Sequence, residues 1–373
     1  MKDPLRDAAA LGQSVWQDDL SRAQLSSGEL AELVDAGVRG ITANPTTFEK
    51  AFAGGSGYDA PLRELVESGL RDPKELYEEL AIRDVQDAAD LLHVAYEDSE
   101  GRDGLVSFEV SPLLAHDTAG TIEEARRLHR KIARANVMIK VPGTAEGFPA
   151  IAELTGLGIH VNVTLLFGVD AYRYAAEAYL AGLEKLVEGG GDPARVASVA
   201  SFFLSRIDTA VDGLLSAEIE SSGLPERRES MLKLLGRTAI ANAKIAYAAF
   251  QESLRSPRWK ALAAWGARPQ RPLWASTGVK NPRYPKLMYV EALIGPDTVD
   301  TMPRDTLLDF RKHGRAAPTL VQGLDEARQL MASLTDAGVN LAEITAGLVE
   351  QGIQLFTASY DKILKSLGAK IRD

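Results

Sequence analysis

The chain of 373 residues contains no cysteine. Disulfides, thiolate metal sites and a cysteine nucleophile are therefore excluded. Long apolar stretches are lacking too. The first residues do not contain the apolar run of a signal peptide, and no later segment offers the roughly 18 consecutive apolar residues of a membrane span. These absences lead us to expect a cytoplasmic protein with no membrane partner.

Several motifs of cofactor and metal chemistry are missing as well. No Gly-x-Gly-x-x-Gly turn follows an expected strand, and the sequence has neither a P-loop nor a Gly-x-Ser-x-Gly elbow. The five histidines do not have the spacing of metal ligands. We therefore expect chemistry that uses no metal ion and no organic cofactor.

Positive charge is scarcer than negative charge. The chain has 42 Lys and Arg residues against 52 Asp and Glu residues, which gives a formal net charge of -10 and a pI of about 5.2. This balance disfavours a nucleic-acid partner, which would require a basic face. It does not disfavour a phosphorylated small substrate, because a few local cations suffice for one phosphate. The oligomeric state stays open between a monomer and a small homo-oligomer.

Short apolar runs alternate with amphipathic helical segments along the chain. Several runs are continuous, as expected for parallel strands that are buried on both faces. Eight strands alternating with helices predict the α/β class, as a single eight-stranded parallel β/α (TIM) barrel with its site at the carboxyl ends of the strands. A doubly wound open sheet is the structural alternative. The expected strands are Val15–Asp19, Gly40–Asn44, Leu105–Pro112, Val137–Val141, Ile159–Leu166, Val196–Phe203, Pro272–Thr277 and Tyr289–Ile294.

The uneven spacing of the expected strands predicts additional helices. We expect a helical insertion around residues 207–265, including a helix at Glu226–Phe250, and C-terminal helices around residues 320–370. No Gly-, Ser- or Pro-rich linker marks a boundary. Residues 1–373 are therefore predicted to form a single domain.

Capping residues predict where some of the helices begin. Ser26 and Thr121 each stand three residues before a glutamate, which is the spacing of a capping box. Asp72 stands directly before Pro73, which predicts an N-cap followed by proline in the first turn.

The clearest candidate for chemistry is Lys140, within the apolar run Val137-Met-Ile-Lys-Val-Pro-Gly-Thr144. Burying an ammonium group is costly, so such a lysine either loses its charge or finds an acidic partner. A neutral lysine can attack a carbonyl carbon and form an imine. The alternative is a lysine that reaches solvent from the strand end or simply pairs with an acid.

Polar side chains stand at the ends of the other expected strands. In a parallel barrel these ends converge on one mouth. Imine chemistry needs such a set, because protons must be moved and substrate hydroxyls must be oriented. Each residue alone also has an ordinary explanation as a cap, a turn residue or a core hydroxyl. The candidates are Asp18, Asp19, Thr42, Asn44, Thr46, Glu109, Asn162, Thr164 and Ser201.

A candidate anion site follows the sixth and seventh expected strands. Arg206 comes shortly after the sixth strand, and Ser276, Thr277, Gly278 and Lys280 come after the seventh. Barrels often hold a phosphate near the last loops, where an arginine and a Ser/Gly loop can clamp it. The alternative is an ordinary arginine at a helix end beside a loop lysine.

Five segments resemble, in order, the longer bacterial members of the transaldolase family, in the class I aldolase superfamily. The likeness extends from about Leu11 to the C-terminus, and the segments are specific as a set. This resemblance implies an eight-stranded β/α barrel that forms a lysine imine. The segments are Val15-Trp-Gln-Asp-Asp-Leu-Ser-Arg22, Gly40-Ile-Thr-Ala-Asn-Pro-Thr-Thr47, Met138-Ile-Lys-Val-Pro-Gly-Thr144, Val161-Asn-Val-Thr-Leu-Leu-Phe167 and Trp274-Ala-Ser-Thr-Gly-Val-Lys-Asn281.

The resemblance also implies a role for each catalytic residue. Lys140 matches the imine nucleophile, and Glu109 matches an acid/base carboxylate that acts through a water. Thr164 matches the threonine that positions this water. Asp18 matches the aspartate that takes the hydroxyl proton during carbon–carbon cleavage, with the adjacent Asp19 as the alternative.

Six further residues match the binding positions of the family. Two asparagines are implied to hold the hydroxyl groups of the intermediate, and a serine is implied to lie near the imine. Shorter transaldolases carry an arginine close behind the phosphate-site serine, and we take a lysine as its candidate substitute here. These residues are Asn44 and Asn162, then Ser201, and for the phosphate Arg206 and Ser276 with Lys280 as the substitute.

The implied reaction is the reversible transfer of a dihydroxyacetone unit from sedoheptulose 7-phosphate to glyceraldehyde 3-phosphate, which gives erythrose 4-phosphate and fructose 6-phosphate. A fructose 6-phosphate aldolase would share the fold and the lysine but release free dihydroxyacetone. Phe203, where that branch tends to carry tyrosine, favours transaldolase. A catalytically inactive barrel with a binding role is the third alternative. A transaldolase fused to phosphoglucose isomerase is a further alternative, and we expect 373 residues to be too few for it.

Overall fold

A computed structural model describes residues 3–54 and 57–371, and its centre is a closed barrel. Eight parallel strands follow one another around the barrel in chain order, and β8 pairs with β1 to close it. This confirms the predicted α/β barrel and rules out the open sheet. The strands are β1 Gln13–Asp18, β2 Gly40–Thr42, β3 Leu105–Glu109, β4 Val137–Pro142, β5 Val161–Leu166, β6 Ser198–Phe203, β7 Arg271–Ala275 and β8 Thr298–Met302.

The first seven strands lie where the sequence predicts them, but the eighth prediction is wrong. The apolar run Tyr289–Ile294 forms the short helix α14, Met288–Ala292, and its continuation. Val290 and Ile294 are buried in an apolar cluster with residues of neighbouring helices and of the strands β1 and β8. A short apolar run does not distinguish a buried helix from a strand. The eighth strand is Thr298–Met302. The sequence does not predict it, because threonine and aspartate make this segment polar.

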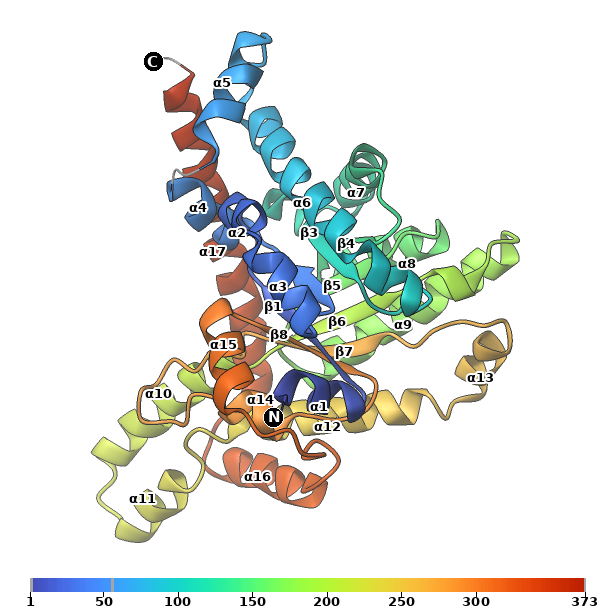
Figure 1. The fold of residues 1–373 in the computed structure, drawn as a ribbon. Coiled ribbons are helices and arrows are strands. Elements are labelled where there is room, and N and C mark those ends of the chain that lie inside the picture. The colour runs from blue at the N-terminus through green and yellow to red at the C-terminus, as the bar shows by residue number, and fades with distance from the viewer. Residues whose placement is uncertain (1–2, 55–56, 372–373) are drawn as a thin grey trace.

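Helices surround the barrel, as Figure 1 shows, with α10 and α11 extending away from it. The α-helices are α1 Pro4–Ala10, α2 Arg22–Ser27, α3 Glu29–Ala36, α4 Pro45–Ala53, α5 Asp59–Glu67, α6 Pro73–Asp98, α7 Thr118–Ile132, α8 Gly147–Gly156, α9 Val169–Glu188, α10 Ser205–Ser221, α11 Pro225–Leu232, α12 Thr238–Ser253, α13 Pro257–Ala264, α14, α15 Arg304–His313, α16 Leu324–Asp336 and α17 Leu341–Lys370. Two short 3-10 helices are Pro112–Leu114 and Pro193–Arg195.

The predicted additional helices are present. Helices α10 to α13 occupy the predicted insertion, and α16 and α17 are the C-terminal helices. The single helix predicted at Glu226–Phe250 is instead divided into α11 and α12 by a turn. That residues 1–373 form a single domain stays a prediction. Among the described residues, no helix combines the length and the apolar character needed to cross a bilayer.

Helix starts were predicted correctly only where the cap lies next to proline. Asp72 caps α6, and its side chain accepts a hydrogen bond from the Lys74 N–H at 2.7 Å. Ser26 is not a cap, because it lies within α2. Thr121 is not a cap either, because α7 begins earlier, behind Asp117. In α7 the side chain of Asp117 accepts from the Gly120 N–H, because the cap must reach the N–H groups of the first turn.

The core lies within the barrel and between the strands and the helices. Trp16 on β1 is fully buried, and its ring covers the backbone of β2 at Gly40. A Cβ atom at Gly40 would lie 2.4 Å from that ring, so only glycine fits there. The indole N–H of Trp16 donates to Asp103 at 3.1 Å, so burial leaves it satisfied.

Helix α17 crosses the barrel beside α4 and α6 (Figure 1). It has 30 residues, and its C-terminal end lies near α5, where the Lys370 ammonium pairs with the Asp59 carboxylate at 2.6 Å. Near its middle it contacts α4 through the hydroxyls of Ser359 and Thr46, 3.2 Å apart. The last helix of the chain therefore reaches the strand ends of the first half of the barrel.

Candidate active site

Lys140 and Glu109 form a buried pair on neighbouring strands. Glu109 ends β3, Lys140 lies in β4, and the strand register places the two residues opposite each other. The Lys140 Nζ atom lies 3.2 Å from Oε2 of Glu109, and the two side chains are 4% and 2% exposed. Burial raises the pKa of the Glu109 carboxyl, and the charge of the Lys140 ammonium opposes this rise. The pair is therefore placed to exchange a proton.

Asp18 lies at the end of β1 and faces the same mouth. Its Oδ1 accepts a hydrogen bond from the Thr42 hydroxyl at 2.9 Å, and that hydroxyl lies 2.8 Å from the hydroxyl of Thr301. Burial raises the pKa of Asp18, and the Lys140 charge is the largest opposing effect. A carboxyl held in this way can act as a base near Lys140. Asp19 does not line the cavity that Asp18 lines.

Asn162 is held between two hydroxyl groups. Its Nδ2 donates to the Ser107 hydroxyl at 3.0 Å, and its Oδ1 accepts from the Ser201 hydroxyl at 2.7 Å. Ser201 lines the cavity, whereas Asn162 lies behind it. Thr164 also lines the cavity, and its buried hydroxyl has no hydrogen-bond partner among the residues that the structure describes. An unsatisfied buried hydroxyl is suited to hold a water or a substrate hydroxyl.

Asn44 has a structural role as the N-cap of α4. Its Oδ1 accepts from the backbone N–H groups of Thr46 and Thr47 at 3.0 and 3.1 Å. Asn44 also lines the cavity. Because the cap uses Oδ1, the amide group of the same side chain is fixed as the donor that remains for a ligand. Asn44 can therefore cap α4 with its Oδ1 atom and still offer its amide NH2 group to a ligand.

Three of the predicted anion-binding residues gather at the side of β6 and β7. Arg206 lies in the first turn of α10, and its Nη1 is buried without a hydrogen-bond partner among residues 3–54 and 57–371. Burial lowers the pKa of this guanidinium group. Ser276 adopts a left-handed backbone (φ 57°), and its hydroxyl lies 2.9 Å from that of Ser205. With Lys280 on the same wall, the arrangement suits an anion.

One cavity of about 230 Å³ unites most of these side chains. Glu109 and Asn162 lie outside its wall, behind Lys140 and Ser201. Sequence reasoning missed Thr301, Lys50 and Phe356, which also line it. Their place depends on a strand that was not predicted and on two helices, so no local motif marks them. The predicted residues on the wall are Asp18, Asn44, Lys140, Thr164, Ser201, Arg206, Ser276 and Lys280.

Glu109 borders a second, much smaller space beside the main cavity. This space has about 10 Å³ and is also lined by Tyr77 and Tyr360. Roughly 10–15 Å³ is the least that accommodates a water molecule. The position fits a carboxylate that acts through water.

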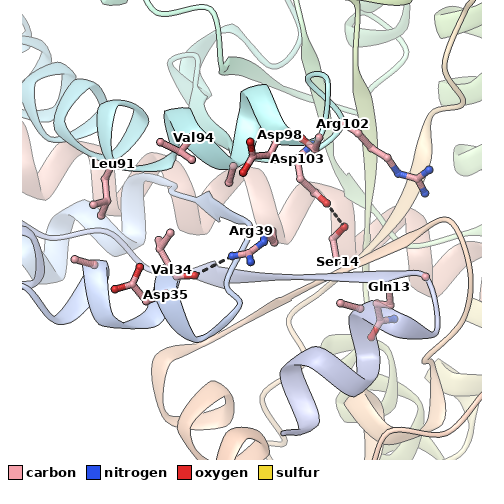
Figure 2. Close-up of a pocket in the computed structure, with 15 residues that line it drawn as sticks. Gln13, Ser14, Val34, Asp35, Arg39, Leu91, Val94, Asp98, Arg102 and Asp103 are labelled. Carbon is pink, nitrogen blue, oxygen red and sulfur yellow. Dashed lines mark hydrogen bonds between the residues drawn. The ribbon is translucent and has the colours of Figure 1, made fainter.

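A larger cavity, of about 830 Å³, opens at the other end of the barrel. Figure 2 shows Ser14 and Asp103 bonded to each other there, at 2.6 Å, and Arg39 donating to the Val34 carbonyl. Asp103 also pairs with Arg271 at 3.0 Å. Ser14, Asp103 and Arg271 therefore bond to one another at the end of the barrel opposite Lys140.

Asp300 on β8 is a further buried carboxylate, outside the main cavity. It is fully buried, and neither carboxylate oxygen has a hydrogen-bond partner among the described residues. The hydroxyl of the nearby Thr277 donates to the Thr301 carbonyl. Burial raises the pKa of Asp300 to about 8 from an ordinary value of 3.8.

This raised pKa predicts a loss of stability with rising pH. Between about pH 4 and pH 8 the folded state keeps a proton on Asp300 that the unfolded state releases, so the free energy of unfolding falls as pH rises through this window. Asp300→Asn should remove that fall. We expect the stability of the variant relative to the unchanged protein to improve by on the order of 3 kcal/mol between pH 5 and pH 9.

Urea unfolding of both proteins at the two pH values measures this difference. Asp305→Asn, on an exposed carboxylate, is the control and should show no such change. A stability difference between Asp300→Asn and the unchanged protein that is independent of pH would contradict the buried-acid explanation.

Among the described residues, no group of three or more His, Asp or Glu side chains is arranged to hold a metal ion. That the chemistry uses no metal and no cofactor stays a prediction. A β/α barrel with a buried lysine–carboxylate pair at its mouth is the arrangement of a class I aldolase.

Comparison with known proteins identifies the family within this class. The family model described as transaldolase/fructose-6-phosphate aldolase matches residues 15–367. The transaldolase of Thiobacillus denitrificans is 47% identical over 364 residues, which are 97% of this chain and 99% of that protein. Transaldolase 2 of a Nostoc species is 46% identical over 97% of this chain and 96% of its own length. The transaldolase of Frankia alni is 44% identical over 100% of this chain and 98% of its own length.

The chain belongs to the transaldolase/fructose-6-phosphate aldolase family. Because these relatives match it over nearly their whole length, its enzymatic activity is that of a transaldolase. The predicted family, fold and activity are confirmed. The roles of the individual site residues remain predictions.

Proposed function

We propose that the enzyme moves a dihydroxyacetone unit from sedoheptulose 7-phosphate to glyceraldehyde 3-phosphate through an imine on Lys140. The observation that carries this proposal is the buried pair of Lys140 and Glu109, 3.2 Å apart, at the mouth that Asp18 also faces. A nucleophile, a proton carrier and a second base are the minimum set for imine formation followed by carbon–carbon cleavage.

The first half of the reaction forms the imine. Lys140 must lose a proton before Nζ can attack the C2 carbonyl of the donor, and Glu109 is near enough to accept it. The carbinolamine then loses its hydroxyl as water. Glu109 supplies the proton for this step through a water held by Thr164, whose hydroxyl is free of other partners among the described residues. The raised pKa of Glu109 favours its acid form for this donation.

The second half breaks the carbon–carbon bond. Asp18 takes the proton of the C4 hydroxyl, and the bond between C3 and C4 breaks as its electrons move into the protonated imine. The raised pKa of Asp18 strengthens it as a base. The aldose phosphate leaves, and the enamine on Lys140 stays until the acceptor aldehyde arrives. Asn44 and Ser201 orient the hydroxyls of the bound unit, and Asn162 supports Ser201.

The phosphate end of the substrate is assigned to Arg206, Ser276 and Lys280. The buried, unpaired Nη1 of Arg206 supports this assignment, since a guanidinium N–H without a partner is costly until an anion binds. A fixed phosphate holds the reacting carbons near Lys140, so remote binding energy serves the chemical step.

The partners that follow from this mechanism are phosphorylated sugars. We place the enzyme in the cytoplasm as a monomer or small homo-oligomer, and we assign it no nucleic-acid partner because its net charge is -10.

Trapping of the imine tests this function. The protein is incubated with fructose 6-phosphate, reduced with borohydride, and examined by intact and peptide mass spectrometry. We expect a three-carbon adduct on the peptide that contains Lys140, because only a live imine is reduced to a stable amine. Erythrose 4-phosphate added before reduction should discharge the adduct and form sedoheptulose 7-phosphate.

Two outcomes would contradict the proposal. A folded protein that gives no adduct would refute the imine mechanism and favour an inactive barrel. An adduct that erythrose 4-phosphate does not discharge, together with free dihydroxyacetone in solution, would favour a simple aldolase.

A further inference from the structure

Two threonine hydroxyls connect Asp18 on β1 to the last strand of the barrel. In the closed barrel β1 lies between β2 and β8. Thr42 ends β2, and Thr301 lies one residue before the end of β8. The two hydroxyl oxygens lie 2.8 Å apart, and that of Thr42 also lies 2.9 Å from Oδ1 of Asp18. All three side chains line the cavity that contains Lys140, so this contact belongs to the site.

The number of protons sets the direction of these hydrogen bonds. An ionised carboxylate only accepts, and a hydroxyl group has one proton to donate. When Asp18 is ionised, Thr42 donates its proton to Oδ1, so Thr42 accepts in its contact with Thr301. Thr301 is therefore the donor in that contact. The chain of donors runs from Thr301 through Thr42 to Asp18.

Asp18 depends on this chain for its hydrogen bonding. Among the residues that the structure describes, Thr42 is the only donor to the side chain of Asp18, and it is also the only partner of the Thr301 hydroxyl. The Thr301 carbonyl accepts from the Thr277 hydroxyl at 3.2 Å, which holds this end of β8 in place. One hydrogen bond polarises the next in such a chain, so donation by Thr301 strengthens donation by Thr42.

We propose that Thr301 is a positioning residue for carbon–carbon cleavage, which acts through Thr42 to hold Asp18 as an oriented, ionised base. This inference rests on the role of Asp18 in the mechanism proposed above. Thr42 engages Oδ1, so Oδ2 is left to take the proton of the C4 hydroxyl. That proton passes from the substrate to Asp18, and neither threonine gains or loses a proton in the step.

The surroundings of Asp18 set the pH above which it acts as a base. Burial raises the pKa of Asp18, and nearby cations and the hydrogen bond from Thr42 oppose this rise. A weaker hydrogen bond from Thr42 therefore raises the pKa further, because that bond favours the ionised form. The charged neighbours stay the same in variants of Thr301, so a difference between variants reports the hydroxyl chain. These neighbours are Lys140, Lys50, Lys280, Asp19, Glu109 and Arg206.

Cleavage is measured apart from imine formation when the reaction with fructose 6-phosphate is quenched with borohydride at short times. The six-carbon adduct on Lys140 reports the imine, and its conversion into the three-carbon adduct reports cleavage. Thr301→Val removes the hydroxyl and keeps the branched shape. It should move the acid limb of the pH profile of cleavage to higher pH by roughly half a unit, which is a roughly threefold loss of rate below the midpoint. The rate of imine formation and the KM for fructose 6-phosphate should stay within roughly twofold.

Three further variants are the controls. Thr301→Ser keeps the hydroxyl and should restore the profile. Thr42→Val removes the donor to Asp18 and should move the acid limb by roughly one unit. Because Thr301 acts through Thr42, the double variant should behave like Thr42→Val alone. Thr155→Val changes a fully buried threonine of α8 that does not line the cavity, and it should leave the profile unchanged.

The outcomes separate this inference from the proposed function. A folded, unchanged protein that gives no adduct overturns the imine mechanism, and cleavage that persists in Asp18→Asn overturns the role of Asp18. If both tests succeed and the acid limb of Thr301→Val coincides with that of the unchanged protein, only the role of Thr301 is overturned. Single-variant shifts that add in the double variant overturn it too, since Thr301 would then act without Thr42. If Thr301→Val does not fold, Thr301→Ala is compared with Thr301→Ser by the same criterion.

Discussion

Lys140→Ala is expected to lower the rate of transfer by about five orders of magnitude, because it removes the only atom to which the dihydroxyacetone unit is bound in the mechanism. The three-carbon adduct after borohydride reduction should disappear with it. Lys140→Met keeps the length and bulk of the side chain in a site that is only 4% exposed, and it should be equally inactive. Coupled assay of erythrose 4-phosphate formation measures the rate, and peptide mass measures the adduct.

The cavity itself provides the control for this experiment. Lys280 lines the same cavity at its anion end. Lys280→Ala should still form the adduct on Lys140, with a KM for fructose 6-phosphate that is raised by roughly tenfold, since one cation is lost from the phosphate site. An adduct that persists in Lys140→Ala on another lysine, such as Lys50 or Lys280, would contradict the assignment of the nucleophile.

Asp18→Asn is expected to stop the reaction one step later. Asparagine keeps the shape of the side chain but cannot take the hydroxyl proton, so the rate of transfer should fall by about three orders of magnitude. Imine formation does not need this base. Borohydride with fructose 6-phosphate should therefore trap an uncleaved six-carbon adduct on Lys140, in place of the three-carbon adduct of the unchanged enzyme. The mass of the adduct is the measurement.

Asp19→Asn is the matched control, one residue further along the chain. Asp18 lines the cavity and accepts from Thr42, whereas Asp19 is only partly buried and does not line that cavity. Asp19→Asn should therefore stay within roughly threefold of the unchanged rate and give the three-carbon adduct. The opposite pattern, with cleavage blocked in Asp19→Asn, would move the role of the base to Asp19.

The two variants together divide the mechanism at a defined point. In the proposed mechanism Lys140 acts in every step, whereas Asp18 acts only when the carbon–carbon bond breaks. The proposed mechanism assigns Glu109 to the first part, and its raised pKa and its distance to Nζ support that assignment. The absence of an adduct in Lys140→Ala and the six-carbon adduct in Asp18→Asn therefore test the order of steps as well as the identity of the groups.

The sequence by itself determined the class of fold and most of the residues of the candidate site. Continuous apolar runs identified the buried parallel strands, because a strand covered on both faces has no polar side to alternate. Polar residues at the ends of those runs marked a candidate site, because parallel strands in a barrel bring their carboxyl ends together. Eight of the ten predicted site residues line one cavity, and the other two lie directly behind it.

The hydrophobicity of a segment failed to predict its structure where polar residues are buried. The eighth strand, Thr298–Met302, contains Asp300 and two threonines, all buried, whereas the apolar Tyr289–Ile294 is not a strand. A polar side chain within a barrel wall is stabilised by its neighbours across the sheet, such as Thr301 beside Thr42. Such partners are distant in the chain, so composition alone gives no indication of them.

Only the tertiary structure decided how the groups act on one another. The register of β3 and β4 sets the 3.2 Å between Glu109 and Lys140, and burial then raises the pKa of the carboxyl. The position of Phe356 depends on the packing of α17 across the barrel, through Gly352 against Leu165. The sequence contains the residue types and their order. Distances, desolvation and contacts between remote segments arise only when the barrel closes and its last helix packs against it.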